Sequence, residues 1–124
     1  MLASAAVACP ELPVTWPLEE LQRPPTVFPA PGFAQPGLRA LYYEGLPFQQ
    51  RPTRVFAWVG LPEARPGDRN PGMVLVHGGM GTAYPNWVRF WMSRGYAAIA
   101  MDLNGCLPVG QNGQWQRHEW AGPL

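Results

Sequence analysis

The chain has 124 residues and a net charge of +1, and its 14 Gly and 16 Pro together make about a quarter of its positions unfavourable inside helices or strands. Its 47% hydrophobic content, with six Trp, four Tyr and five Phe, exceeds what a disordered chain carries, so we expect one folded domain at most. The basic residues are all Arg and are scattered, which argues against a nucleic-acid surface. No apolar run approaches the roughly 18 residues that span a bilayer, so we expect no membrane span.

Residues 1–36 form a Pro-rich lead-in, for which the sequence predicts extended chain with no regular period. An early Ala6-Val7-Ala8 is similar to the cleavage site of a secretory signal, but the charged start of such a signal is missing. Two interpretations stay open. The segment is the remnant of an export signal of a secreted or periplasmic protein, or it is the ordinary apolar N-terminus of a cytoplasmic one.

Residues 37–124 form the predicted domain, which opens with two strand candidates. Residues 41–44 are a short apolar and aromatic run ended by Gly45 and Pro47. Residues 53–60 alternate between two sets of β-branched, aromatic and small side chains, which is typical of a strand with two different faces. We expect the two strands to form one hairpin.

A strand, a loop, a helix and a second strand follow. Residues 73–76 and 96–101 are uninterrupted apolar runs, which predict strands buried on both faces. Between them, Pro85 suits a first helical turn and Gly95 suits a helix end. This order is a βαβ unit, so the predicted fold class is α/β with a partly parallel sheet. Residues 103–124 show no periodic element.

The most informative feature is His77-Gly78-Gly79, directly after the first apolar run. Glycines at the carboxyl end of a strand allow a sharp turn whose N–H groups are open to an anion, and α/β sheets bind ligands at that edge. A dinucleotide fold needs a G-x-G-x-x-G spacing that this loop lacks. A phosphate loop needs Lys, which the chain does not contain. The oxyanion loop of an α/β-hydrolase is the third use of such a segment.

Residues 74–108, VLVHGGMGTAYPNWVRFWMSRGYAAIAMDLNGCLP, resemble the N-terminal half of bacterial α/β-hydrolases of the acetyl xylan esterase and dienelactone hydrolase type. The segments 53–62 and 114–123 are similar to that family's second strand and to the loop after its fourth strand. The resemblance implies the N-terminal part of an α/β-hydrolase fold, a hairpin plus a βαβ unit. It also implies hydrolysis of carboxylic esters by the full enzyme, with acetylated carbohydrate as the substrate class and with no cofactor or metal.

The same resemblance assigns roles to particular residues. The N–H groups of Gly79 and Met80 are the candidate oxyanion donors, and His77 braces their loop. Met80 departs from the family pattern, in which Gly is common at this position. Trp115 and Trp120 are candidates for lining a substrate cleft. The remaining aromatic residues considered are interpreted as packing side chains: Trp58, Trp87, Phe90 and Trp91.

The nucleophile of the family is absent from these residues. The serines are Ser4 and Ser93, and neither lies in a G-x-S-x-G elbow. Cys106 lacks the flanking glycines of an elbow and is interpreted as a structural or loop-borne thiol, and His118, beside Glu119, as a loop histidine without a catalytic or metal-binding role.

The sequence therefore predicts the N-terminal fragment of a serine ester hydrolase, truncated before the nucleophile elbow and inactive alone. A peptidase of the same superfamily and a stand-alone binding protein without enzymatic activity remain as alternatives.

A missing neighbour strand is a further expectation. In the family sheet the strand of residues 73–76 lies between the strand of residues 96–101 and the nucleophile-bearing strand. Without the latter, its outer edge is bare, and apolar side chains on the uncovered face are partly exposed, namely Val74, Val76, Ile99 and Met101. A bare apolar edge predicts self-association.

Overall fold

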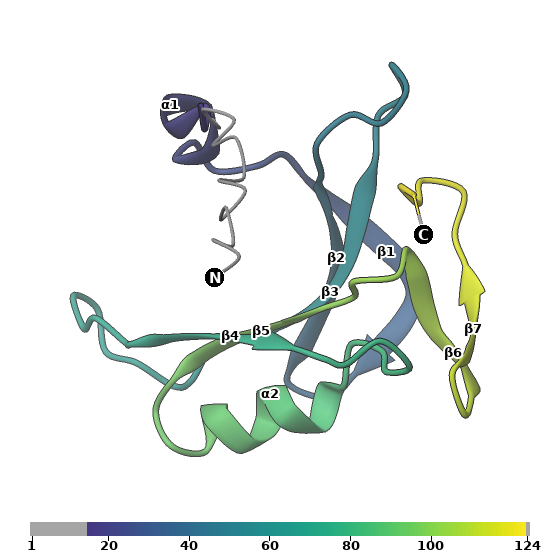
Figure 1. Cartoon of the computed structure of the whole chain (residues 1–124). Coiled ribbons are helices and arrows are strands. Elements are labelled where there is room, and N and C mark those ends of the chain that lie inside the picture. The colour runs from purple at the N-terminus through teal and green to yellow at the C-terminus, as the bar shows by residue number, and fades with distance from the viewer. Residues whose placement is uncertain (1–14, 124) are drawn as a thin grey trace, which may run out of the picture.

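A curved five-stranded sheet carries a helix on one face, with a two-stranded hairpin beside it (Figure 1). This computed structural model describes residues 15–123, so the signal-like segment and Cys9 lie outside the described residues. The elements are α1 (Leu18–Leu21), β1 (Val27–Gln35), β2 (Leu38–Glu44), β3 (Arg54–Gly60), β4 (Gly72–Val76), α2 (Pro85–Met92), β5 (Ala97–Met101), β6 (Cys106–Gln111) and β7 (Gln114–Arg117). Within the described residues, neither helix is long and apolar enough to cross a membrane.

The strand order of the large sheet is β1-β2-β3-β5-β4. The predicted hairpin is confirmed, since β2 and β3 pair antiparallel from Arg39 with Val59 to Glu44 with Arg54. The predicted βαβ unit is also confirmed, because β4 and β5 pair in parallel and α2 connects them. Parallel pairing is confined to this one pair, since β3 meets β5 antiparallel. The fold is therefore mixed α/β with a mostly antiparallel sheet.

The Pro-rich lead-in contains a strand that the sequence analysis did not predict. Strand β1 pairs antiparallel with β2 at residues 27–29 and again at residues 34–35, with an irregularity between Pro29 and Ala34. Proline cannot donate to a ladder, so it is tolerated at a sheet edge or a bulge, and β1 is the edge strand. The expectation of extended chain without regular structure was wrong for this segment.

Residues 103–124 were also predicted to lack periodic elements, and this was wrong because they contain β6 and β7. These two strands pair antiparallel around Asn112-Gly113, whose φ angles are 55° and 78°. Both residues are left-handed, as a tight hairpin turn requires, and Asn-Gly is the sequence signal for that turn. The signal was present, but the polar and Gly-rich flanks masked it.

The core lies between α2 and the face of the sheet that carries Phe56, Trp58, Leu75 and Ala100. Helix α2 approaches β3 so closely that a Cβ on Gly60 would lie 2.7 Å from Val88 Cγ1. Trp58 is buried, which confirms its predicted packing role. Trp91 also packs against this core, whereas Trp87 and Phe90 are 43% and 49% exposed and contact neighbouring rings, those of Tyr84 and Trp91.

The opposite face of β4 and β5 is not covered by a helix of the described residues (Figure 1). Val74 and Val76 are 62% and 54% exposed, and Ile99 and Met101 are half-buried. The apolar runs predicted that both faces of these strands are buried, and this is wrong for the described residues because only one face is covered. The exposure of these four side chains, which was predicted from the missing neighbouring elements, is confirmed, and β4 forms one edge of the sheet.

We expect this apolar edge to cause self-association of the chain. The unpaired N–H and C=O groups of β4 can pair with another strand, and burying Val74 and Val76 would be favourable by about 25 cal/mol per Å² of apolar area. At micromolar concentration, sedimentation should show insoluble material or oligomers. The double variant Val74→Lys/Val76→Lys should raise the monomer fraction. A monomeric parent chain with slow amide exchange in residues 73–76 would contradict the prediction.

Candidate functional site

The buried carboxylate of Asp102 organises the chain where β5 ends. Asp102 is 3% exposed, and its Oδ2 accepts hydrogen bonds from the Asn104 N–H at 2.8 Å and the Cys106 N–H at 2.7 Å. The same carboxylate therefore turns the chain after β5 and fixes the start of β6. Its other oxygen, Oδ1, lies 3.3 Å from Nε2 of His77.

His77 is buried at the end of β4 and joins two loops through its ring. Nε2 accepts the Leu103 N–H at 3.0 Å, so the ring proton lies on Nδ1, which donates to the Gly78 carbonyl at 2.6 Å. The imidazole thus connects the loop after β4 with the turn after β5. Its contacts are those of a residue that holds a loop in place.

Three successive carbonyl groups of the loop that follows, those of Gly78, Gly79 and Met80, are held by hydrogen bonds. The Gly78 carbonyl also accepts the Gly81 N–H at 2.8 Å, the Gly79 carbonyl accepts the Asn104 side-chain amide at 2.8 Å, and the Met80 carbonyl accepts the Trp115 indole N–H at 3.0 Å. Three consecutive peptide groups are therefore fixed in orientation by these hydrogen bonds.

The N–H groups of Gly79 and Met80 consequently point away from those partners, because C=O and N–H lie on opposite sides of a trans peptide. The described residues contain no cis peptide. Across residues 15–123, no hydrogen-bond acceptor is assigned to either N–H group. Two exposed backbone N–H groups at the carboxyl edge of β4 thus have no acceptor among the described residues.

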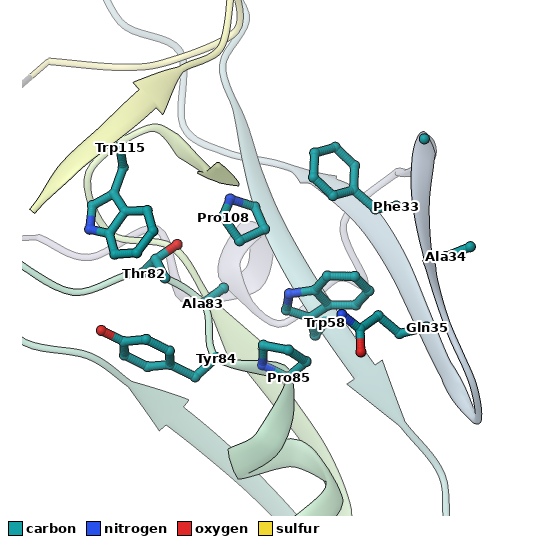
Figure 2. A pocket seen from close by; sticks show the side chains of 11 residues that line it. Phe33, Ala34, Gln35, Trp58, Thr82, Ala83, Tyr84, Pro85, Pro108 and Trp115 are labelled. Atoms are coloured by element: carbon teal, nitrogen blue, oxygen red, sulfur yellow. The ribbon is translucent and has the colours of Figure 1, made fainter. Parts of the chain in front are cut away.

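A cavity of about 330 Å³ lies beside this loop (Figure 2). Its walls come from β1, from Trp58 of β3, from residues 82–84 before α2, from Pro85 at the start of α2, and from the hairpin residues Pro108 and Trp115. Trp115 thus both holds the Met80 carbonyl and lines a cavity. The Gly79 and Met80 N–H groups are not part of this cavity's wall.

Trp120 does not line this cavity and packs on Arg54 instead. The Arg54 guanidinium stacks between the rings of Phe28 and Trp120, at 3.6 Å and 4.0 Å from their centroids. The Trp120 carbonyl also accepts the Arg54 N–H at 3.0 Å. This cation–π arrangement attaches the C-terminal segment to β3. The two tryptophans that the sequence analysis grouped as cleft residues are therefore held by different partners.

Cys106 and His118 are both buried near Asp102. Burial and the negative charge of Asp102 raise the pKa of the Cys106 thiol, which keeps it protonated and weakly nucleophilic. Its Sγ contacts the Asn104 and Trp115 carbonyls. His118 packs edge-on against Tyr42 with ring centroids 5.2 Å apart. Neither residue is placed as a nucleophile, and the described residues contain no cluster of three metal-ligating side chains.

Comparisons with known proteins give one distant structural neighbour to report. No protein-family model matches the chain, and no curated protein matches it. Among solved structures, an acetyl xylan esterase from Paenibacillus sp. R4 aligns with 84% of this chain at 24% identity and a TM-score of 0.47. The chain spans about a third of that protein, 32% of its length. A match of this kind does not assign the chain to a family.

The contacts of the loop glycines predict different tolerance to substitution. A Cβ on Gly81 would lie 2.9 Å from Cβ and Nδ1 of His77, so Gly81→Ala must displace the imidazole. A Cβ on Gly79 would meet no atom within 4 Å. In thermal unfolding, we expect Gly81→Ala to destabilise the chain by about 1–3 kcal/mol and Gly79→Ala to be nearly neutral. Equal effects of the two variants would show that His77 does not constrain the loop.

Burial of His118 predicts that stability falls in mild acid. Burial lowers the pKa of this imidazole, and the opposing negative charge of Asp102 does not offset it. The unfolded state, with a pKa of about 6.5, therefore binds more protons than the folded state. The contribution of His118 is full above about pH 6.5 and is lost as the pH falls through the folded-state pKa.

The variant His118→Phe keeps a ring against Tyr42 and cannot titrate. Unfolding midpoints measured between pH 7.5 and 5 should therefore fall less steeply for His118→Phe than for the parent chain. Parallel pH profiles would mean that another group controls acid sensitivity.

Proposed function

We propose that this chain supplies the oxyanion-binding loop of a serine ester hydrolase of the α/β-hydrolase type, with the N–H groups of Gly79 and Met80 as the donors. The observation that carries the proposal is that the Gly78 and Gly79 carbonyls, which share peptide groups with these two N–H groups, are held by hydrogen bonds, while the N–H groups have no acceptor among the described residues. Donors fixed before the reaction stabilise a developing oxyanion without reorganisation, which is worth several kcal/mol in ester hydrolysis.

The reaction would follow the acyl-enzyme route. A serine attacks the ester carbonyl, whose oxygen becomes an oxyanion and accepts hydrogen bonds from Gly79 and Met80. A general base takes the serine proton and returns it to the leaving alcohol, and water, deprotonated by the same base, then hydrolyses the acyl-enzyme. Ser93 does not suit the nucleophile role, because it follows α2 and its hydroxyl donates to the Phe90 carbonyl at 2.8 Å. Under this proposal the nucleophile comes from polypeptide beyond these 124 residues.

His77 acts in this scheme as a positioning residue. Both of its ring nitrogens are already engaged, one by the Gly78 carbonyl and one by the Leu103 N–H, so it is not assigned proton transfer. For the substrate we propose acetylated carbohydrate, as the sequence resemblance implies. Trp115 is the residue best placed to contact it, because its indole adjoins both the loop and a cavity. The proposed binding role of Trp120 remains a prediction.

The test compares Met80→Pro with Met80→Ala. Proline removes the Met80 N–H, which has no acceptor to lose within the described chain, whereas alanine keeps it. In an enzyme that joins this chain to a G-x-S-x-G segment encoded in the same reading frame, kcat should fall by about 10²–10³ for Met80→Pro. KM should change little, and Met80→Ala should be mild. The 124-residue chain alone should not turn over aryl acetates above background.

Two outcomes would overturn the proposal. If Met80→Pro and Met80→Ala lower kcat equally while their unfolding midpoints match the parent's, the side chain matters and the amide does not. If the chain alone shows saturable turnover and a serine- or cysteine-directed phosphonate labels it, the chemistry resides in these residues and the nucleophile has been wrongly assigned.

A further inference from the structure

A surface hollow of about 520 Å³ lies beside the turn of the β6–β7 hairpin, and we call it the hairpin hollow. Met80 and Tyr84, from the segment between β4 and α2, form one wall, and the other consists of Gln111, Asn112, Gly113 and Trp115. Tyr84 and Trp115 also line the cavity of about 330 Å³, where Figure 2 shows them on the side opposite Phe33. Met80 lines the hairpin hollow and does not line that cavity.

The hairpin turn lies in direct contact with Met80. The Trp115 indole N–H donates to the Met80 carbonyl at 3.0 Å. A Cβ on Gly113 would lie 3.0 Å from Cε and 3.4 Å from Cβ of Met80, so glycine allows this close approach. Asn112 and Gly113 have the positive φ angles of a tight hairpin turn, which gives the turn a defined backbone. The hairpin therefore holds its side chains beside the residue whose N–H is a proposed oxyanion donor.

The walls of the hairpin hollow combine aromatic surface with amide groups. The rings of Tyr84 and Trp115 offer apolar area. Gln111 and Asn112 are exposed, and each carries an amide that both donates and accepts hydrogen bonds. Among the described residues, no charged side chain lines the hollow. A sugar ring matches this combination, because it is neutral, its hydroxyl groups donate and accept, and its C–H bonds form an apolar face.

The position of the hollow indicates which part of an ester it would take. In an ester whose carbonyl oxygen accepts the Met80 N–H, the acyl carbon chain and the alcohol oxygen both begin two bonds from that oxygen. An acetyl group ends there in one methyl and needs little space. Small-molecule sites span roughly 300–1,000 Å³, so a hollow of about 520 Å³ suits the larger alcohol part.

We propose that the hairpin hollow binds the sugar ring of the ester's alcohol part, with the C–H face of the ring against Trp115 and Tyr84 and its hydroxyl groups hydrogen-bonded to the amides of Gln111 and Asn112. The inference rests on the proposed function, because Met80 connects the hollow to the reaction. It makes Gln111 and Asn112 specificity-determining residues, and the sequence analysis selected neither of them.

Ligand-detected saturation-transfer NMR on the 124-residue chain tests the hollow without any reaction, and it tolerates oligomers. The probe is methyl β-D-glucopyranoside, which has no ester carbonyl and so does not need the oxyanion donors. We expect it to bind saturably, and cyclohexanol, a ring with one hydroxyl group, to bind at least threefold more weakly. Gln111→Met and Asn112→Gly each remove one amide and should weaken glucoside binding about threefold to tenfold. Glycine at position 112 keeps a residue that this turn accepts.

The matched control is Gln114→Met, because Gln114 pairs with Gln111 across the hairpin and does not line the hollow. This variant should leave glucoside binding unchanged. The assignment of the hollow is overturned if the glucoside does not bind at tens of millimolar, if cyclohexanol binds as tightly, or if Gln114→Met weakens binding as much as Gln111→Met does.

Turnover separates this inference from the proposed function. In the enzyme that joins this chain to a G-x-S-x-G segment, acetylated methyl glucoside and ethyl acetate share the acetyl group and differ in the alcohol. Gln111→Met should lower kcat/KM for the acetylated glucoside by about threefold to tenfold relative to ethyl acetate, whereas Met80→Pro should lower kcat for both. An equal effect of Gln111→Met on the two esters would overturn the hollow as the alcohol site. Unchanged kcat in Met80→Pro would overturn the oxyanion assignment instead, and the NMR result would still decide the sugar site.

Discussion

The buried carboxylate of Asp102 is the interaction on which the candidate site depends. A carboxylate removed from water is costly unless hydrogen bonds compensate, and Asp102 obtains them from the Asn104 and Cys106 N–H groups. Pairing Oδ2 with these two N–H groups bends the chain after β5 into a fixed turn, while Oδ1 has no hydrogen-bond partner among the described residues. Because β4 and β5 are parallel, their carboxyl ends share one edge of the sheet, and the turn therefore lies against the loop after β4. His77 connects the two through Leu103 and Gly78.

The turn after β5 also helps to orient the N–H groups of the loop after β4. Asn104, whose backbone is held by Asp102, donates its side-chain amide to the Gly79 carbonyl, which shares a peptide group with the Met80 N–H. Trp115 of the β6–β7 hairpin donates its indole N–H to the Met80 carbonyl and so fixes the next peptide group, that of Gly81. Asn104, which lies 25 positions after Gly79 in the sequence, thus fixes the direction of the Met80 N–H by binding the Gly79 carbonyl. Glycines make the loop possible, but contacts with the segments after β5 select its conformation.

These long-range contacts separate what the sequence could predict from what it could not. The β2–β3 hairpin and the βαβ unit follow from local periodicity and turn residues, which are short-range signals. Strand β1 contains prolines that only an edge position tolerates, and an edge is a property of the whole sheet. The β6–β7 hairpin was accessible through Asn112-Gly113. The candidate loop was recognisable from His77-Gly78-Gly79, whereas the orientation of its amides, and the stacking of Trp120 on Arg54, depend on tertiary contacts.

The exposed edge of β4 and the candidate loop are directly connected in the chain, because Val76 ends β4 and His77 begins the loop. Any strand that pairs with the free edge of β4 must run beside residues 72–76, and one end of that strand reaches the level of His77. If the added strand is parallel, its carboxyl end lies at the same edge as the Gly79 and Met80 N–H groups, where α/β sheets assemble their sites. A parallel strand that covers the apolar edge would therefore bring the residues that follow it to the open donors. An antiparallel strand would bury the same side chains but place its amino end there. The direction of the strand on β4 thus decides whether covering this edge also completes the site.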